Sequence, residues 1–142
     1  MSAAPRRDWL AQTITGSSAG RVIERRALHD VAALRARAEA AGWQTFHFAC
    51  EQLPGKPEFL AAAAAALGFP PYFGGNWDAF EECLADLSWL PARPRLLLLS
   101  GVAAFAARTP EDWATARAIL TDAGETWAGS ATPLVIALGA RP

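Results

Sequence analysis

The chain has 142 residues, of which 52% are apolar and 19% are charged, and its formal net charge is −1. This composition indicates one folded domain and excludes a disordered chain. A net charge near zero gives no overall support for binding to DNA, RNA or a membrane surface. The charges are nevertheless uneven, because basic residues concentrate between Arg6 and Arg37 and only acids occur between Glu58 and Asp86.

The N-terminal part of the chain differs from the rest in composition. Residues 1–26 contain few long apolar side chains and are predicted to form a loosely ordered arm, with a short strand at Val22–Ile23. Residues 27–142 are predicted to form a single domain. It begins with a helix over Ala27–Ala41, which Gly42 would end. The alternating apolar residues of Gln44–Ala49 then predict a strand.

The remaining segments alternate between helix and strand. In chain order they are a helix over Pro57–Leu67 ending at Gly68, a helix from Asn76, a strand over Arg95–Ser100, a helix from Thr109-Pro110 to about Ala123, a short helical piece around Trp127 and a strand over Leu134–Leu138. Strands that are apolar throughout and separated by crossover helices indicate a buried parallel sheet. The sequence thus predicts the α/β class, with a three-stranded parallel sheet packed with helices and an additional N-terminal helical segment.

The helix after Gly74-Gly75 has two contrasting faces. Asn76 is a favourable N-cap, because its side-chain oxygen can accept a hydrogen bond from the first turn. One face is apolar and comprises Trp77, Phe80, Cys83, Leu84 and Leu87, whereas the other is acidic and comprises Asp78, Glu81, Glu82 and Asp86. Like charges at these spacings cost roughly 0.2–0.5 kcal/mol per pair. The fold alone therefore gives no reason for the acidic face.

A loop with two adjacent aromatic residues, Tyr72 and Phe73, precedes this helix. Two neighbouring aromatic side chains cannot easily both point into the core. Large aromatics beside charges on a rigid loop–helix junction are typical of a binding hot spot. The alternative interpretation is a solvated polar face on an ordinary amphipathic helix, and the residues alone leave both open.

This segment resembles the barstar family, small intracellular inhibitors of secreted ribonucleases. The family's characteristic run joins a proline, an aromatic pair, a glycine and an asparagine to a large apolar residue, Asp-Ala, and an acidic residue followed by Cys-Leu. In this chain the run is Pro71, Tyr72, Phe73, Gly74, Asn76, Trp77, Asp78, Ala79, Phe80, Glu82, Cys83 and Leu84. Outside the run, the resemblance rests on the order of elements from Trp43 to Leu138.

The resemblance implies a partner and a role for each residue. In the family, the loop and helix enter the ribonuclease active-site cleft, so a secreted or toxin-type basic ribonuclease is expected in a one-to-one complex. Tyr72 would lie against the catalytic site, Asp78 and Glu82 would be the central carboxylates, and Asn76 and Cys83 would be structural. The predicted partner-binding residues are Tyr72, Phe73, Gly74, Gly75, Asn76, Trp77, Asp78, Glu81 and Glu82.

Two positions depart from the family pattern. Glu82 occupies the central position that holds an aspartate in the best-known member, and Glu81 occupies a position that holds an interface tryptophan there. These differences leave the predicted fold intact and bear on which ribonuclease is bound. A same-fold binding module for another basic protein is the first alternative, and a small enzyme that uses Asp78 and Glu82 is the second.

The sequence offers little for catalysis. His29, His47, Cys50 and Cys83 are isolated, and Walker, nucleophile-elbow, His-x-x-x-His and Cys-x-x-Cys patterns are absent. We therefore expect no enzymatic activity, cofactor or metal, and no direct binding to nucleic acid or membranes. The two cysteines suit reduced core thiols. Because we find no export signal and no apolar run long enough to span a membrane, we expect a cytoplasmic protein.

Overall fold

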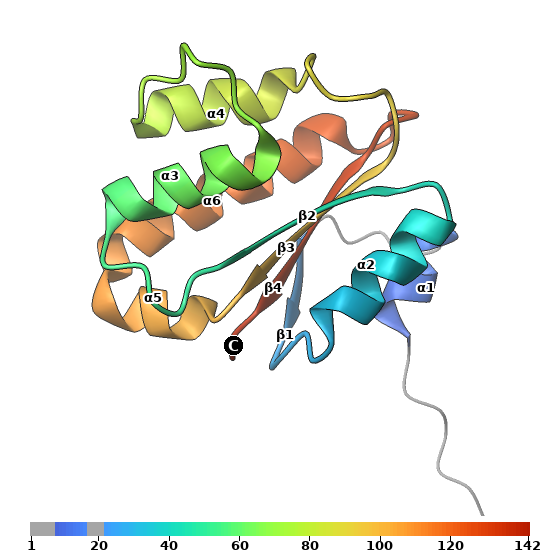
Figure 1. Ribbon diagram of the computed structural model, residues 1–142, viewed down its shortest axis with the longest axis horizontal. Coiled ribbons are helices and arrows are strands. Elements are labelled where there is room, and N and C mark those ends of the chain that lie inside the picture. The colour runs from blue at the N-terminus through green and yellow to red at the C-terminus, as the bar shows by residue number, and fades with distance from the viewer. Residues whose placement is uncertain (1–7, 17–21) are drawn as a thin grey trace, which may run out of the picture.

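A four-stranded parallel sheet lies at the centre of the molecule, in the strand order β1-β4-β3-β2. The structure is a computed structural model that describes residues 8–16 and 22–142 (Figure 1). The strands are β1 (Val22–Arg25), β2 (Gln44–Ala49), β3 (Arg95–Ser100) and β4 (Leu134–Gly139). Every residue of β3 and β4 is buried. The α/β class and the parallel sheet predicted from the sequence are confirmed.

The sheet has one strand more than the three predicted. The short strand expected at Val22–Ile23 extends to Arg25 and pairs with β4 at the edge of the sheet. Glu24 and Arg25 are exposed. An edge strand has a single neighbour and tolerates such charged residues. The continuous apolar pattern that identifies the central strands is therefore missing from β1.

Helices cover both faces of the sheet (Figure 1). On one face lie α1 (Trp9–Ile14) and α2 (Val31–Ala40), and on the other lie α3 (Lys56–Leu67), α4 (Trp77–Asp86), α5 (Val102–Arg108) and α6 (Pro110–Trp127). Alternate residues of β3 point to opposite faces. Leu96 and Leu98 lie in the smaller core cluster, on the face of α1 and α2, and Leu97 and Leu99 lie in the larger core cluster, on the face of α3 to α6. Burying both faces explains why the central strands are apolar throughout.

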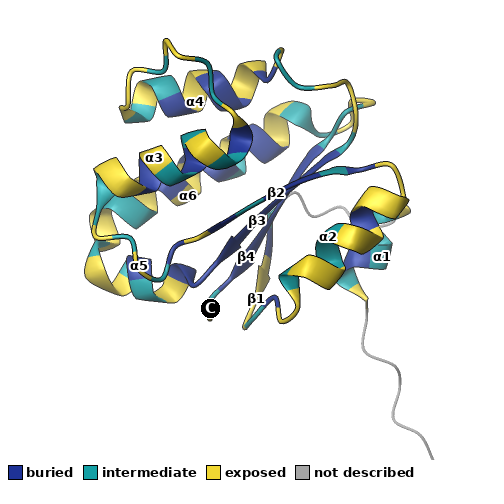
Figure 2. Ribbon diagram, viewed as in Figure 1, coloured by how far each residue is buried: buried dark blue, intermediate teal, exposed yellow. Residues whose placement is uncertain are grey.

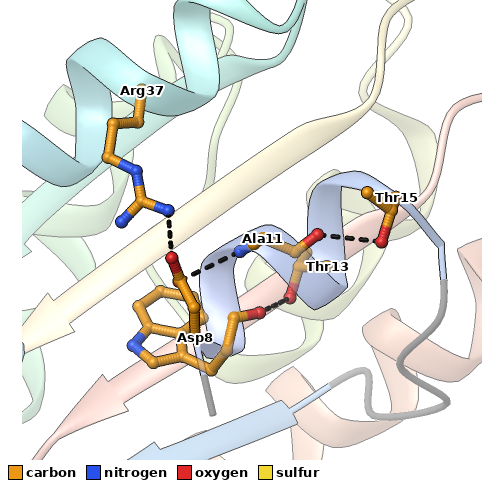
Figure 3. A network of polar contacts seen from close by, with 6 residues as sticks. Asp8, Ala11, Thr13, Thr15 and Arg37 are labelled. Atoms are coloured by element: carbon orange, nitrogen blue, oxygen red, sulfur yellow. Dashed lines mark hydrogen bonds and ion pairs between the residues drawn. The ribbon is translucent and has the colours of Figure 1, made fainter. Parts of the chain in front are cut away.

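The N-terminal helix α1 is joined to α2 by a small polar network (Figure 3). The Asp8 carboxylate accepts a hydrogen bond from the Ala11 N–H and forms an ion pair with Arg37. The Ala11 bond first, and then Arg37, lowers the pKa of the Asp8 carboxyl. Leu10 is fully buried against the sheet. The division at residue 26 into an arm and a domain stays a prediction, and residues 1–7 and 17–21 lie outside the described residues.

Three helices differ from the prediction, two in their ends or caps and one in not having been predicted. The helix expected from Ala27 begins at Val31, because the backbone of His29 has φ 61° and the Asp30 side chain caps the helix through the Ala33 N–H. Helix α5 was missed. The helix from Pro110 runs unbroken to Trp127. The hydroxyl of Thr109 donates to the Phe105 carbonyl of α5, so it does not cap α6 as expected.

Phe59 of α3 lies at the centre of the larger core cluster. Its side chain is fully buried. The ring lies 5.3 Å from that of Phe48 on β2, 5.1 Å from Phe105 on α5 and 5.9 Å from Phe80 on α4, measured between centroids. One aromatic side chain thus joins the sheet to three helices, including the helix with the acidic face.

Candidate protein-binding site

The start of α4 is built as the sequence predicted. The Asn76 side-chain oxygen accepts a hydrogen bond from the Ala79 N–H at 2.8 Å. Gly75 has φ 69°, which a residue with a side chain rarely adopts. Gly74 has no such dihedral, and a Cβ added there would meet the Asn76 Nδ2 at an ordinary 3.5 Å. Of the two glycines, only Gly75 is therefore required by the backbone of the turn.

The two faces of α4 are separated as predicted (Figure 2). Phe80, Cys83 and Leu84 are buried, as is Leu87 directly after the helix, and Trp77 is half-buried. The acidic surface, defined as Asp78, Glu81, Glu82 and Asp86, is exposed. The described part of the chain forms two ion pairs, and both lie elsewhere. No described cation therefore neutralises the acidic surface.

The loop before α4 folds back and forms a hollow of about 180 Å³ with the helix. The hollow is lined by Tyr72, Phe73, Ala79, Glu82, Cys83 and Asp86. Tyr72 is 74% exposed and is the one large apolar side chain among residues 8–16 and 22–142 that is exposed. Phe73 instead packs edge-on against Phe69, with ring centroids 5.0 Å apart. The two neighbouring aromatics therefore point in different directions, as expected.

The hollow brings together only part of the predicted binding set. Tyr72, Phe73 and Glu82 line it, whereas Asp78 and Glu81 share the exposed face without lining it. Trp77 packs against Phe59 and lies beneath the Lys56 ammonium. The roles of these residues in binding stay predictions.

Asp86 is a wall of the hollow that was left out of the predicted binding set. The sequence feature that could have added Asp86 to the binding set is its position four residues after Glu82, on the same acidic face. What the spacing does not reveal is that the loop carrying Tyr72 reaches the second half of the helix.

Both thiols are poor nucleophiles. Burial raises the pKa of the Cys50 thiol to about 12. Burial, together with the Asp86 and Glu82 carboxylates, raises the pKa of the Cys83 thiol. The thiolate is the reactive form of cysteine, and both groups are therefore protonated at neutral pH.

His47 lies on the opposite side of β2 from Phe46 and Phe48 and forms a hydrogen bond with Ser100. Its Nε2 atom lies 2.9 Å from the Ser100 hydroxyl oxygen. Burial first, and then the positive charge of Arg35, lowers the pKa of His47.

The described residues include no group of three His, Cys, Asp or Glu side chains placed to hold a metal ion. They also include no helix with the length and apolar character needed to cross a membrane.

Two tryptophans bind backbone carbonyls at the C-terminal ends of α3 and α4. The last carbonyls of a helix have no partner within the helix. The Trp127 indole N–H donates to the Leu84 carbonyl of α4 at 2.7 Å, and the Trp89 indole N–H donates to the Leu67 carbonyl of α3 at 3.0 Å. Both carbonyls belong to the last turns of their helices. These bonds help to fix α4 relative to α3 and α6.

Replacing Trp127 with phenylalanine should therefore destabilise the protein. The change removes the donor and leaves the Leu84 carbonyl without its partner, which we expect to lower the free energy of unfolding by about 1–3 kcal/mol. Urea denaturation followed by circular dichroism measures it. Trp113→Phe removes a similar volume from the same core cluster and is the control. Equal losses in the two variants would attribute the effect to ring volume alone.

The geometry defines an α/β domain that presents an acidic helix, an exposed tyrosine and a hollow between them. A model of the barstar family, described as barnase inhibitor, matches residues 43–139 of this chain. The chain belongs to the barstar family, as its sequence run predicted. The match extends from the start of β2 to the end of β4, so α1, β1 and α2 precede it. A search of curated protein sequences found no match.

Proposed function

We propose that the protein inhibits a basic ribonuclease by occupying its RNA-phosphate site with the acidic surface. The observation that carries this proposal is the hollow, in which Glu82 and Asp86 adjoin the exposed ring of Tyr72. Membership of a family described as barnase inhibitors gives independent support. A ribonuclease must hold phosphate with cationic side chains, and these are complementary to unpaired carboxylates.

The acidic surface suits this task because it is held rigidly. Asn76 caps the start of α4, and the indole of Trp127 binds a carbonyl near its end. Side chains on a fixed helix lose less conformational entropy on binding than those on a mobile loop. Charge complementarity would speed association and make it dependent on salt, and ion pairs at the desolvated centre would slow dissociation.

The finer features of the proposal follow from the same surface. We propose a one-to-one complex, because one hollow and one acidic helix would fill one active-site cleft. The protein would act in the cytoplasm without a cofactor, and it would not bind nucleic acid directly. A same-fold module for another basic protein is the alternative, and the glutamates at positions 81 and 82 favour a partner different from that of the best-known family member.

The proposal is tested by titrating a panel of small basic microbial ribonucleases with the wild-type protein. Inhibition with a one-to-one endpoint is the expected result. Asp78→Ala/Glu82→Ala should lose that endpoint, whereas Glu24→Ala/Glu111→Ala should keep it, because that control removes two exposed carboxylates outside α4. A basic protein other than a nuclease, recovered with wild type and not with the first variant, would favour the alternative.

A further inference from the structure

Three arginines gather where the carboxyl ends of β1 and β4 meet. We name Arg25, Arg26 and Arg141 the arginine end. The Arg25 carbonyl accepts a hydrogen bond from the Ala140 N–H, and the Arg26 carbonyl accepts one from the Arg141 N–H, each at 3.0 Å. These backbone bonds fix the three residues side by side, although Arg141 is far from the other two in the sequence. All three are exposed.

The arginine end is short of counter-charge. Within the described residues the ion pairs join Arg37 to Asp8 and Arg117 to Glu24, so none of the three arginines takes part in one. Of the carboxylates nearest in sequence, Glu24 binds Arg117, whereas Asp30 caps α2 through the Ala33 N–H and keeps its negative charge. Glu51 lies close to Gly101 at the same edge of the sheet, without an ion pair to the arginines. The three guanidinium groups therefore outnumber Asp30 and Glu51, the two carboxylates that remain near this end.

The acidic surface and the arginine end lie at opposite ends of the molecule. Figure 1 shows α4 at the top of the view, and the end of β1 and the C-terminus at the bottom. The two surfaces cannot meet within one copy. Each lacks the charge that the other supplies, with four carboxylates without an ion pair at one end and three guanidinium groups without one at the other.

We propose that the protein associates head to tail with a second copy of itself, the arginine end of one copy against the acidic surface of the next. Such a contact joins different surfaces of identical chains, so it leaves a free surface of each kind and can continue. The proposal uses the acidic surface of the proposed function but needs no ribonuclease. If the protein both inhibits a ribonuclease and associates with itself, self-association covers the inhibitory surface and competes with the nuclease.

A protein surface fits the arginine end better than a nucleic acid does. The chain has a net charge of −1 and a pI of about 6.1, which gives it no overall attraction for an extended polyanion. A compact acidic patch on another protein needs to approach only the arginine end. This chain carries such a patch on a rigid helix.

The contact should be weak and sensitive to salt, because it relies on exposed charges. The screening length is about 30 Å at 0.01 M salt and about 3 Å at 1 M. Analytical ultracentrifugation of the full chain alone, across a range of concentrations, measures the association. At the lower salt we expect the average mass to rise above the 15.1 kDa of one chain as concentration increases. At the higher salt it should return to that of the monomer.

Complementary variants test which surfaces meet. Arg25→Gln/Arg26→Gln/Arg141→Gln removes the arginine end and keeps the acidic surface. Asp78→Asn/Glu81→Gln/Glu82→Gln/Asp86→Asn removes the charges of the acidic surface and keeps the arginine end. Each variant alone should remain monomeric at low salt, and the two mixed should form a one-to-one dimer and nothing larger, because only one matching pair of surfaces remains. Arg37→Gln/Arg93→Gln removes positive charge at other exposed positions, keeps the Arg117–Glu24 ion pair beside the arginine end, and should associate like wild type.

A monomeric wild type at the lower salt, or a mixture that forms no dimer, would overturn the proposal. Association of the arginine-end variant on its own would also overturn it. If wild type stays monomeric and instead binds a single-stranded RNA oligonucleotide that the arginine-end variant does not bind, the occupant is nucleic acid and the proposal is wrong. These measurements contain no ribonuclease, so their outcome is independent of the proposed inhibition. The arginine-end variant should still inhibit the nuclease.

Discussion

Glu82→Ala is expected to weaken binding to the ribonuclease by more than about 2 kcal/mol, which is roughly thirtyfold in Kd. Glu82 is exposed in the free protein and lines the hollow beside Tyr72 and Asp86. In the complex its carboxylate would be enclosed with a cation of the enzyme. Removing it would leave that cation desolvated without a partner, which costs more than an ion pair in water contributes. Titration calorimetry with the inhibited nuclease measures the change.

Neighbouring carboxylates show whether the effect belongs to the hollow. Glu82→Gln keeps the shape and removes the charge, so it should lose most of the same affinity. Glu81→Ala removes an equal charge from the same helix outside the hollow, and we expect a loss below about 1 kcal/mol, as for an exposed pair. Glu111→Ala, outside α4, should leave the Kd unchanged. If Glu81 and Glu82 have equal effects, the hollow is not the centre of the interface.

Phe59→Ala is expected to lower the free energy of unfolding by about 3–5 kcal/mol, the usual cost of removing a fully buried phenylalanine. Its ring is fully buried and contacts aromatic side chains of β2, α4, α5 and α6. For a domain of this length the loss corresponds to a decrease in Tm of roughly 10–20 °C. Calorimetry and urea denaturation measure both quantities.

A half-buried ring provides the comparison for Phe59. Phe69 packs on the same cluster from the loop before α4 and is only partly buried, so Phe69→Ala should cost clearly less. Phe59→Leu keeps most of the apolar volume and should recover much of the stability. A loss below about 1 kcal/mol for Phe59→Ala would contradict the role of this ring in joining α3, α4 and the sheet.

The agreement between sequence and structure is best in α4. Its cap at Asn76 and its buried stripe of Phe80, Cys83 and Leu84 are confirmed, because capping and helical periodicity act over a few residues and do not depend on the rest of the fold. The start of α2 and the cap and end of α6 differ from the prediction. Asp30 and Thr109 are both good capping residues, and only the neighbouring backbone decides which of them caps a helix.

By itself the sequence determined the α/β class, the central strands, the acidic helix and the barstar family, since each depends on local pattern and spacing. The tertiary structure alone decided that β1 pairs with β4, that the loop carrying Tyr72 forms a hollow with Glu82 and Asp86, and that Arg141 lies beside Arg26. These contacts join residues that are distant along the chain or lie in segments without a periodic pattern. Packing between distant parts of the chain determines these contacts, and no local spacing in the sequence encodes that packing.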